Sequence, residues 1–383
     1  MLSEFNLGML ISEKQQRFIE DSLAACFGDI ALNFDGEKFT ADTPENIDKK
    51  DFQEVLKRLL FIAKGLKGEK VVYEKNGHLA FDKDPLEALK ATRQVVDLGS
   101  GLFQFQGDFL RIFRAVDKYF LSLALTEYNA IDQENPPLWP MELFRKVNYL
   151  NEFPQQAILL AGLKNDHRAI KKFSEEFSSG NQYSSVSLDE RFEEARFGLQ
   201  PAVCDHCYFG LEGLENIDNT VFTTCNKVFR NEDSDNNTLD RLRCFTVRDI
   251  VFVGEKEFVL EKRQHLLEAL VSFFQLTGLN VSIEVADDPF FTNNFEKKMF
   301  QHAFELKYEI LARIPFLDKS IAVGSINLHL DTFGKAFNIS SQNEKIYSGC
   351  IGIGFERLLL SFYSQFGNDL ESWPTGLKQA LEI

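Results

Sequence analysis

The second half of the chain, from Val203 onward, orders its strand-like and helix-like stretches in a way that constrains the fold. Two helical patterns, at residues 258–277 and 295–311, interrupt a series of apolar runs of strand length. Those runs are VFTTCNKVFR, CFTVRDIVFVG, NVSIEVA, SIAVGSINLHL and AFNIS. A parallel sheet needs a crossover helix between successive strands, whereas here several strands follow one another with only turns between them. The order therefore predicts an α+β fold in which helices flank an antiparallel sheet.

The N-terminal part of the chain reads as a separate, smaller unit. Residues 13–26 and 50–65 have helical spacing of their apolar side chains, and a strand-like VVYE follows Lys70. A polar, turn-rich stretch joins the two helical patterns. We expect a small accessory domain over residues 1–84, followed by one larger domain over residues 85–383.

The larger domain is expected to begin with helices. A long helical pattern starts at Asp84 and continues through residues 102–130 to the prolines of NPPLWP, which cannot continue a helix. The next helix is expected over residues 141–150, and the strand-like run QQAILLAGL follows it.

Charge and composition exclude several classes of protein. The 383 residues carry a formal net charge of −16, so the chain lacks the basic field of a protein that grips a long nucleic acid. No apolar run of about 18 residues could span a membrane, and the first residues lack the order of a signal peptide. We therefore expect a cytoplasmic protein with no membrane partner. Its six cysteines should then be thiols or metal ligands rather than disulfides.

Two arginine-centred segments suggest a phosphate site. In VFRNEDSDNNTLDRLRCFTVRDIVFVG, Arg230 and Glu232 end one predicted strand, and a hairpin of this kind can place a planar guanidinium on a phosphate. A solvated hairpin with surface salt bridges is the alternative. In GCIGIGFERLLLSF, Arg357 opens a helix after a glycine-rich strand, a position that suits a terminal phosphate. The glycines lack the third glycine and the βαβ unit of a dinucleotide site. Together the segments read as two halves of one ATP site.

The cysteines allow two kinds of metal site. Cys204 and Cys207 form a CxxC pair, and a closed four-cysteine site would have to recruit the isolated Cys225 and Cys244. An open site would use Cys204, Cys350 and one carboxylate, because three protein ligands leave zinc a free position for a substrate. The residues alone leave this choice open.

These segments resemble motifs of a known family. FRNE…RLRCFTVRD and GCIGIGFER are similar to motifs 2 and 3 of the class II aminoacyl-tRNA synthetase catalytic domain, and NPPLWPMELFRKVNYLNEFP takes the place of motif 1. More narrowly, PAVC, DPFF, SINLHLDTFGKAFNI and SGCIGIGFER resemble the amino acid:[carrier protein] ligases, truncated homologues of archaeal-type seryl-tRNA synthetases that lack a tRNA-binding domain. The resemblance begins near Pro85 and implies that residues 85–383 are a class II synthetase-like catalytic domain.

The resemblance implies roles for individual residues at the nucleotide. Arg230 corresponds to the motif 2 arginine at the α-phosphate, Glu232 to the acid near adenine, and Arg357 to the motif 3 arginine at the γ-phosphate. The two arginines are the expected catalytic residues. The expected ATP-binding set is Arg230, Glu232, Arg241, Phe245 and Arg357, with magnesium.

The resemblance also implies a zinc site for the amino acid. Cys204 and Cys350 match the two cysteine ligands of the family, and Asp249 stands where the family has a glutamate. Aspartate is one methylene shorter, so the ion or the strand would have to move to bring them together. Asn327 and His329 are expected to line the substrate pocket from one face of their strand.

The implied reaction is ATP-dependent activation of an amino acid as its adenylate. Transfer to the phosphopantetheine thiol of a carrier protein would follow, and a zinc-held amine favours a small amino acid such as glycine, alanine or serine. The alternatives are an aminoacyl-tRNA synthetase, a free amino acid ligase, or a catalytically silent nucleotide-binding protein; tRNA is the disfavoured acceptor. A homodimer is expected because motif 1 usually lies at a subunit interface. Candidate basic patches for a carrier protein are Lys57, Arg58, Lys64 and Lys67, or Arg168, Lys171 and Lys172.

Overall fold

The structure is a computed structural model that describes most of the chain from residue 70 to residue 383. In that range it leaves out residues 78, 80, 82, 179–185, 187, 233–237, 289–300, 302–303 and 342–343. Before residue 70 it describes residues 2–6, 15–16, 19–20, 23, 27, 31–35, 38–42, 50, 52–53, 55–57 and 59–60.

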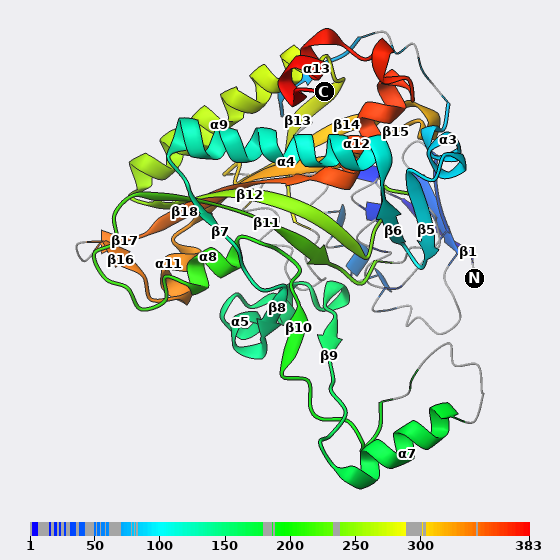
Figure 1. The fold of residues 1–383 in the computed structure, drawn as a ribbon, viewed down its shortest axis with the longest axis vertical. Helices are drawn as coiled ribbons and strands as arrows, with labels where there is room; N and C mark the ends of the chain where they lie inside the picture. Colours follow the sequence, from blue (N-terminus) through cyan, green and yellow to red (C-terminus); the bar gives the residue numbers. More distant parts are fainter. Residues whose placement is uncertain are drawn as a thin grey trace.

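A large twisted sheet forms the centre of the molecule (Figure 1). Its strand order is β4-β13-β14-β15-β18-β12-β11-β7, and every described neighbour pair is antiparallel except β11 with β7. The strands are β4 (Val71–Lys75), β7 (Ile131–Gln133), β11 (Thr220–Phe229), β12 (Cys244–Gly254), β13 (Val281–Ala286), β14 (Lys307–Ile314), β15 (Lys319–Leu330) and β18 (Tyr347–Gly354). The predicted α+β architecture with an antiparallel sheet is confirmed.

The helices surround this sheet. They are α3 (Pro85–Ala91), α4 (Gly107–Tyr128), α5 (Met141–Lys146), α6 (Tyr149–Glu152), α7 (His167–Ser178), α8 (Asp205–Phe209), α9 (Lys256–Thr277), α11 (Thr332–Ala336), α12 (Phe355–Phe366) and α13 (Thr375–Leu381). Short strands add β5 (Val95–Gly99), β6 (Leu102–Phe105), β8 (Leu138–Pro140), β9 (Leu159–Leu160), β10 (Phe197–Leu199), β16 (Ser340–Ser341) and β17 (Glu344–Lys345). Among the described residues, no helix has the length and apolar character needed to cross a membrane.

The two faces of the sheet bury two different cores, because side chains alternate along each strand. On β12, Ile250 and Phe252 belong to the main core, which they share with residues of α4, α9 and α12. Val251 and Val253 point the other way and pack in a second core with Trp139 and residues of α5 and α8. Each fully buried side chain of this size stabilises the fold by about 1.5–3 kcal/mol. The second face carries the candidate site.

Several expected element boundaries were wrong. The helix expected over residues 295–311 gives way to strand β14 from Lys307, and of its earlier part residues 295–300 and 302–303 lie outside the described residues. Lys, Glu, Leu and Ala in KYEILARI favour a helix locally, but pairing with β13 and β15 on both sides overrides that preference.

The long helical pattern from Asp84 is also interrupted. It consists of α3, then the β5–β6 hairpin, then α4, which ends at Tyr128 because Asn129 adopts a left-handed conformation with φ 49°. Asn148, with φ 57°, likewise divides the helix expected over residues 141–150 into α5 and α6.

Two strand predictions shrink in the structure. The run QQAILLAGL contributes only β9, and AFNIS begins at the end of α11 and contributes a single strand residue, Ser340 of β16.

The N-terminal segment forms its own small unit. Strands β1 (Leu2–Asn6), β2 (Ala31–Asp35) and β3 (Lys38–Asp42) pair in the order β1-β3-β2. Residues of β2 and β3 share a separate core with residues that include Ile19 and Leu56. Strand β4, however, pairs with β13 at the edge of the large sheet. We therefore propose that the accessory unit ends before β4 rather than at residue 84.

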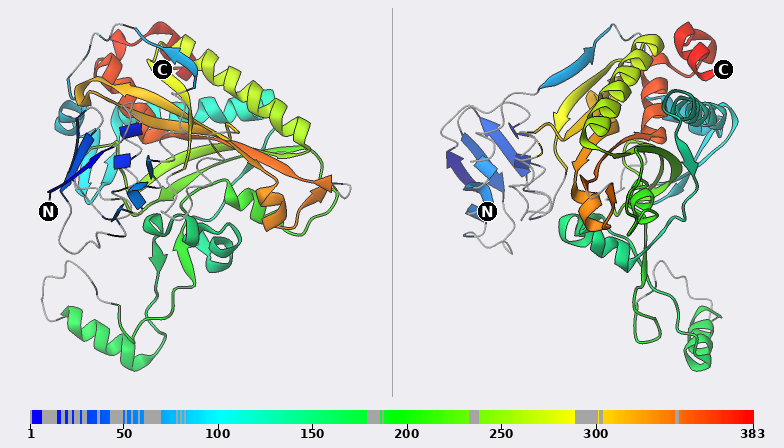
Figure 2. Two further views of the ribbon diagram at one scale, coloured as in Figure 1. Left: turned by 180° about the vertical axis from the view of Figure 1, so that it is seen from behind. Right: turned by 90° about the vertical axis from the view of Figure 1, so that its left-hand side faces the viewer.

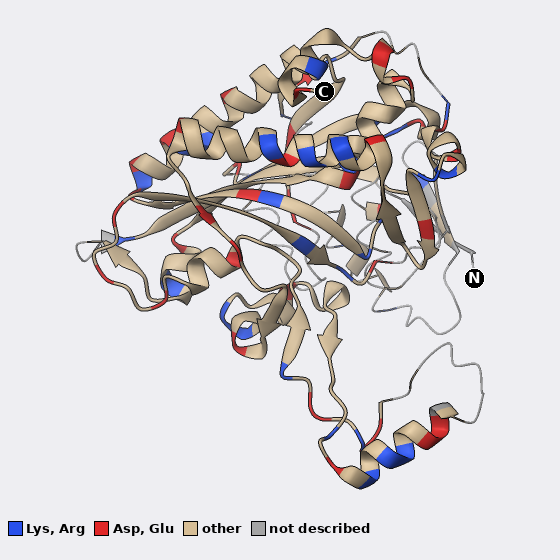
Figure 3. Ribbon diagram, viewed as in Figure 1, with Lys and Arg blue, Asp and Glu red and all other residues tan. Residues whose placement is uncertain are grey.

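A protruding arm leaves the body between β9 and β10. Helix α7 lies apart from the sheet in all three views (Figures 1 and 2). The arm has contacts of its own: Phe173 packs edge-on against Phe192, and Arg191 forms ion pairs with Asp189 and Glu176. Basic residues lie near the start of α7 and acidic residues follow them (Figure 3).

Candidate active site

Cys204, Asp249 and Cys350 come together on the second face of the sheet. One ligand atom from each lies within 4.8 Å of the others, and all three residues are buried. Cys204 immediately precedes α8, Asp249 lies in β12 and Cys350 in β18. Two sulfurs and one carboxylate in this arrangement suit zinc and would leave an open coordination position. Asp249 reaches both cysteines although its side chain is shorter than glutamate.

A glycine makes room for the carboxylate. Gly352 pairs with Asp249 across β18 and β12, and a Cβ atom on Gly352 would lie 2.5 Å from Asp249 Oδ1. Any other residue at position 352 would therefore have to displace this oxygen.

The acidic groups of Asp249, Cys350 and Asp205 lie in the same buried part of the site, and their charges affect one another. Burial, with the charges of Cys350 and Asp205, raises the pKa of Asp249 well above its usual value. The hydrogen bond from Cys204, together with His329, holds the pKa of the Cys350 thiol well below its usual value. Burial raises the pKa of Asp205 to about 6. A bound cation would relieve the repulsion among these groups.

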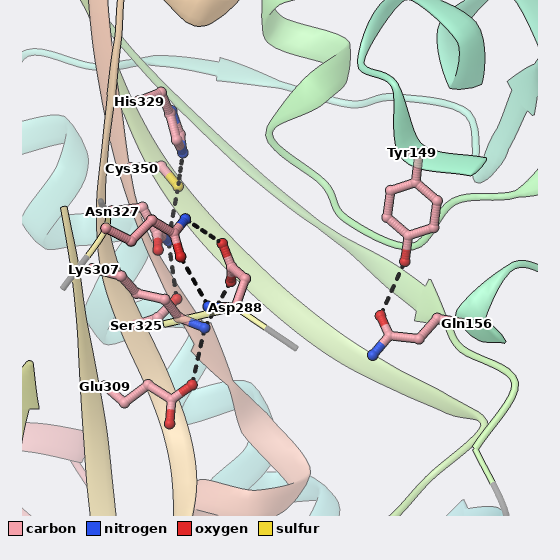
Figure 4. Close-up of polar contacts among 10 residues, drawn as sticks. Tyr149, Gln156, Asp288, Lys307, Glu309, Ser325, Asn327, His329 and Cys350 are labelled. Atoms are coloured by element: carbon pink, nitrogen blue, oxygen red, sulfur yellow. Dashed lines mark hydrogen bonds and ion pairs between the residues drawn. The ribbon is translucent and has the colours of Figure 1, made fainter. Parts of the chain in front are cut away.

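Asn327 and His329, the two residues expected to line the substrate pocket, lie beside this cluster. Asn327 Nδ2 is 3.5 Å from Cys350 Sγ, and His329 Nε2 is 3.8 Å from the same sulfur. The other ring nitrogen of His329 is 3.1 Å from the Tyr208 hydroxyl, and Tyr208 stacks on Phe333 with ring centroids 4.2 Å apart. The histidine ring is thus held between Tyr208 and Cys350. Figure 4 shows its contact with Cys350.

A buried charged group continues the same surface. Lys307 Nζ lies 2.8 Å from Asp288 Oδ1 and 2.9 Å from Glu309 Oε1 (Figure 4). Sequence reasoning missed Lys307 and Glu309 because it placed them in a helix. The alternation of Lys307 and Glu309 in a strand would have been the signal.

Tyr149 and Gln156 contribute from the motif 1 side (Figure 4). The Tyr149 hydroxyl donates to Gln156 Oε1 at 3.1 Å. Burial raises the pKa of Tyr149, while the charges of Arg230 and Asp288 also act on it. Tyr149 is therefore close to both the arginine and the carboxylate, a placement that the sequence did not indicate.

The two predicted phosphate arginines lie near one another. Arg230 Nε donates to the Pro201 carbonyl at 3.3 Å, and its guanidinium carbon is 5.4 Å from the centroid of the Phe245 ring. Arg357 Nε donates to the Asp240 carbonyl at 2.7 Å. Burial, then the charge of Arg230, lowers the pKa of Arg357. Two cations held this close favour a polyanion between them.

Glu232 shares this neighbourhood, because its charge acts on Arg357 against the effect of Arg230. Arg241 is exposed in the turn before β12, and no described contact joins it to Arg230 or Arg357. The loop before it, residues 233–237, lies outside the described residues. The expected role of Arg241 in binding ATP therefore stays a prediction.

The side chain of Glu356, at the start of α12, forms hydrogen bonds with strand β12 of motif 2. Its carboxylate accepts from the Thr246 backbone N–H at 2.8 Å and from the Thr246 hydroxyl at 3.1 Å, and Lys227 Nζ lies 3.3 Å away. Burial raises the pKa of this carboxyl group, and Lys227 opposes the rise. These hydrogen bonds set the position of Arg357, the next residue.

The metal cluster and the expected nucleotide end of the site are both built on β12 and β18. Phe245 and Asp249 are four residues apart on β12, so they face the same side of the sheet at a separation of roughly 13 Å. Cys350 in β18 is likewise followed by Arg357 in α12. This spacing suits an amino acid joined end to end with a nucleotide.

Other expectations have a mixed outcome. The four-cysteine alternative is wrong for the described residues, because the grouped ligands are Cys204, Asp249 and Cys350, and Cys225 packs against the opposite core. The five described cysteines are free thiols.

Of the basic patches suggested for a carrier protein, Arg168, Lys171 and Lys172 are exposed on α7, and Lys57 is exposed in the accessory unit. Arg58, Lys64, Lys67 and the PFF of DPFF lie outside the described residues.

Known proteins resemble this chain in the region of the site. The family model described as "tRNA synthetase class II core domain (G, H, P, S and T)" matches residues 190–366. The type-2 serine–tRNA ligase of Methanococcus aeolicus is 26% identical over 319 residues, which cover 81% of this chain and 61% of the relative. Amino acid–[acyl-carrier-protein] ligase 1 of Bradyrhizobium diazoefficiens is 27% identical over 252 residues, 65% of this chain and 75% of the relative.

Solved structures share the fold. M. kandleri SerRS, in complex with A. aeolicus tRNASec, has a TM-score of 0.70 at 19% identity and covers 100% of this chain and 77% of that chain. The seryl-tRNA synthetase of Pyrococcus horikoshii complexed with ATP has a TM-score of 0.55 at 13% identity, covering 86% and 68%. This chain thus spans about three fifths of the serine–tRNA ligases that it matches. Residues 190–366 therefore match the class II aminoacyl-tRNA synthetase core domain, and most of the chain is similar to type-2 serine–tRNA ligases.

Proposed function

We propose that this protein activates a small amino acid with ATP, forming an aminoacyl adenylate and pyrophosphate. The observation that carries the proposal is that an open metal cluster lies between β12, β18 and the start of α8, while Arg230 directly follows β11 and Arg357 lies in the first turn of α12, which directly follows β18. The seryl-tRNA synthetase solved with ATP supports a nucleotide at this fold.

Each residue then has a task. Cys204, Asp249 and Cys350 would hold the zinc ion, which supplies an open coordination position for the amino group. Arg230 binds the α-phosphate of Mg-ATP and Arg357 the γ-phosphate. A carboxylate oxygen of the amino acid attacks the α-phosphorus, and the bond from that phosphorus to the bridging oxygen breaks, releasing pyrophosphate. Positioning and neutralisation of charge carry such a step, since no proton has to move.

For the acceptor, tRNA is the first candidate. The serine–tRNA ligases match 79–84% of this chain, and a structural relative was solved with a tRNA. This ranking replaces the preference for a carrier protein that the sequence motifs and the net charge suggested. On this reading the 3′ end of the tRNA attacks the adenylate, and the exposed basic residues at the start of α7 are a candidate contact.

A carrier protein is the second candidate. The amino acid–[acyl-carrier-protein] ligase is covered over 75% of its own length, more than the 61% of the serine–tRNA ligases, and the net charge of −16 disfavours a long nucleic acid. Here a phosphopantetheine thiol would attack the acyl carbon of the adenylate, break its bond to the phosphate oxygen, release AMP and leave an aminoacyl thioester.

A homodimer is part of the proposal. Exposed apolar side chains on neighbouring short strands support an interface on the motif 1 side: Ile131, Leu138, Leu159 and Phe197. Light scattering of the purified protein at several concentrations would measure the assembly directly.

Amino-acid-dependent exchange between ATP and pyrophosphate tests the activation step. All twenty amino acids are assayed with zinc and magnesium present, and one or two small ones should give a signal. Arg357→Ala should lower this signal by about 10²–10³-fold with an unchanged circular dichroism spectrum. Undiminished exchange in this variant would contradict the ATP site. Silence for all twenty would favour a nucleotide-binding protein without this activity.

The acceptor is then identified with radiolabelled amino acid. The label is offered with total tRNA in one reaction and with phosphopantetheinylated carrier protein in another. Acid-precipitable label that ribonuclease releases indicates tRNA. Label on the carrier that hydroxylamine releases indicates a thioester.

A further inference from the structure

Lys307 is a buried cation with two carboxylate partners. It is 8% exposed, and its ammonium lies 2.8 Å from Asp288 and 2.9 Å from Glu309. Burial lowers the pKa of Lys307, but the two carboxylates outweigh burial and raise it above its usual value. The side chain is therefore a fixed positive charge at neutral pH.

The register of the sheet places this charge at the end of the site. Lys307 on β14 pairs with Asn327 on β15, which in turn pairs with Cys350 on β18. Side chains of paired residues on antiparallel strands lie on the same face. Lys307 thus stands in the row that ends at the metal cluster. Glu309 begins the neighbouring row, which runs through Ser325 and Gly352 to Asp249.

The two carboxylates serve opposite ends of the site. Asp288 is held a second time, because its backbone N–H donates to Gln301 Oε1 at 2.9 Å and Gln301 Nε2 donates to Asp288 Oδ2 at 2.8 Å. Lys307, its ion-pair partner, pairs across β14 and β15 with Asn327, two residues before His329. Glu309 lies two residues before Leu311 on β14, and Leu311 pairs with Ala322, whose carbonyl accepts a hydrogen bond from Arg357 Nη1 at 3.2 Å. One lysine therefore fixes an acid toward the amino acid and an acid toward the nucleotide.

We propose that Lys307 is a positioning residue that holds Asp288 at the amino acid and Glu309 beside the γ-phosphate arginine at the same time. Asp288 then offers a fixed acceptor to an N–H or O–H of the bound amino acid, and Glu309 keeps Arg357 directed at ATP. This inference rests on the adenylation proposed above.

Stability alone does not account for the group. Burying the ammonium of Lys307 between two partly exposed carboxylates is costly, and well-packed apolar residues of similar volume often stabilise a fold as well or better. The main core on the other face of the sheet is largely apolar, although Arg248 of β12 pairs there with Asp117 of α4. Lys307 and its partners lie instead on the face that carries Cys350 and Asn327, where fixed charges have a use.

A matched pair of variants separates positioning from stability. Lys307→Met removes the charge and keeps most of the volume, and Lys307→Arg keeps the charge. Lys146→Met is the control, because Lys146 is also largely buried and forms ion pairs with two carboxylates, Glu142 and Glu212, on α5 and beyond α8. Each variant is assayed by amino-acid-dependent pyrophosphate exchange at a temperature well below its own melting point.

The expected result is a tenfold or greater rise in the KM of the amino acid for Lys307→Met, with a smaller rise in the KM of ATP. Lys307→Arg should recover most of that loss. Lys146→Met should keep both KM values and kcat even if its melting temperature falls. Normal KM values in Lys307→Met, or the same kinetic losses in Lys146→Met, would overturn the inference while the activation itself stood. A silent wild-type protein would overturn the proposed function and this inference together.

Discussion

At the residue scale, the most informative position is Asp249, which stands where the resembling family has a glutamate. Asp249 was expected to require a shift of the ion or of the strand, and its carboxylate lies within 4.8 Å of both cysteine sulfurs. The strand needs no distortion, because Gly352 opposite it leaves the space. The loss of one methylene is thus accommodated by the neighbouring strand.

Metal analysis of two cysteine variants tests the cluster. Cys350→Ser should lower zinc well below one ion per chain, because it removes one of three ligands, a larger loss than the roughly 10–100-fold effect of an outer partner. Cys207→Ser is the control: Cys207 is equally buried but lies outside the cluster. The zinc content of both is measured by mass spectrometry after gel filtration. Equal losses would show that the cluster is wrongly assigned.

The pH dependence of stability should report Glu356. Burial raises its pKa in the folded protein above the ordinary value of 4.5. The folded state therefore binds this proton more tightly, so the contribution is fully present below pH 4.5 and is lost as pH rises through the folded-state pKa. Glu356→Gln has no such proton, so its stability relative to the wild type should increase between pH 4.5 and pH 7.5. Urea unfolding at both values measures the difference, and a constant difference would refute the assignment.

At the scale of elements, much of the sheet could be predicted and its register could not. Strands β11, β12, β13, β15 and β18 are apolar runs bounded by turns, so the sequence alone located them. Strand β14 was missed, because residues with high helix propensity fill it and only its two neighbours make it a strand. The pairing of β4 with β13 depends on contacts between distant segments and left no local signal.

Some residues of the candidate site could likewise be predicted from the sequence, and others could not. Cys204, Cys350, Arg230 and Arg357 could be found because they lie in short motifs of a known family. The contacts of Lys307 with Asp288 and Glu309 could not, because they follow from the register of β14. Tyr149 was missed for a similar reason, since α6 reaches the site only through tertiary packing.

Two glycines of β18 should differ in their effect on the site. A Cβ atom at Gly352 would meet Asp249 Oδ1 at 2.5 Å, whereas one at Gly354 would meet only the Val323 carbonyl at 3.6 Å, an ordinary contact. Gly352→Ala should therefore displace the carboxylate and weaken zinc binding. Gly354→Ala should leave zinc binding intact.

Competition with a fluorescent zinc chelator measures the affinity of each variant. Thermal unfolding must show that both remain folded. Equal affinity in the two variants would mean that Asp249 is not a ligand.

At the scale of the whole molecule, the sheet edge decides where the chain can be divided. A protein that starts at Lys70 keeps β4, whereas one that starts at Pro85 exposes the edge of β13. The first should retain the melting transition of the large domain. The second should melt roughly 5 °C lower or more, since losing about 2 kcal/mol shifts a domain of this size by several degrees. Scanning calorimetry makes the comparison, and equal transitions would return the boundary to residue 84.

The three proposed metal ligands come from segments that are remote in the sequence, and this has a consequence for how the protein can change. An ion shared by Cys204, Asp249 and Cys350 would act as a cross-link that closes two long loops, and the unfolded chain could not offer the same site. Free energy of binding would then become free energy of folding. A mutation of a metal ligand would then change the stability of the fold together with the choice of amino acid. New specificity should therefore arise more readily at Asn327, His329 and Asp288 than at the ligands themselves.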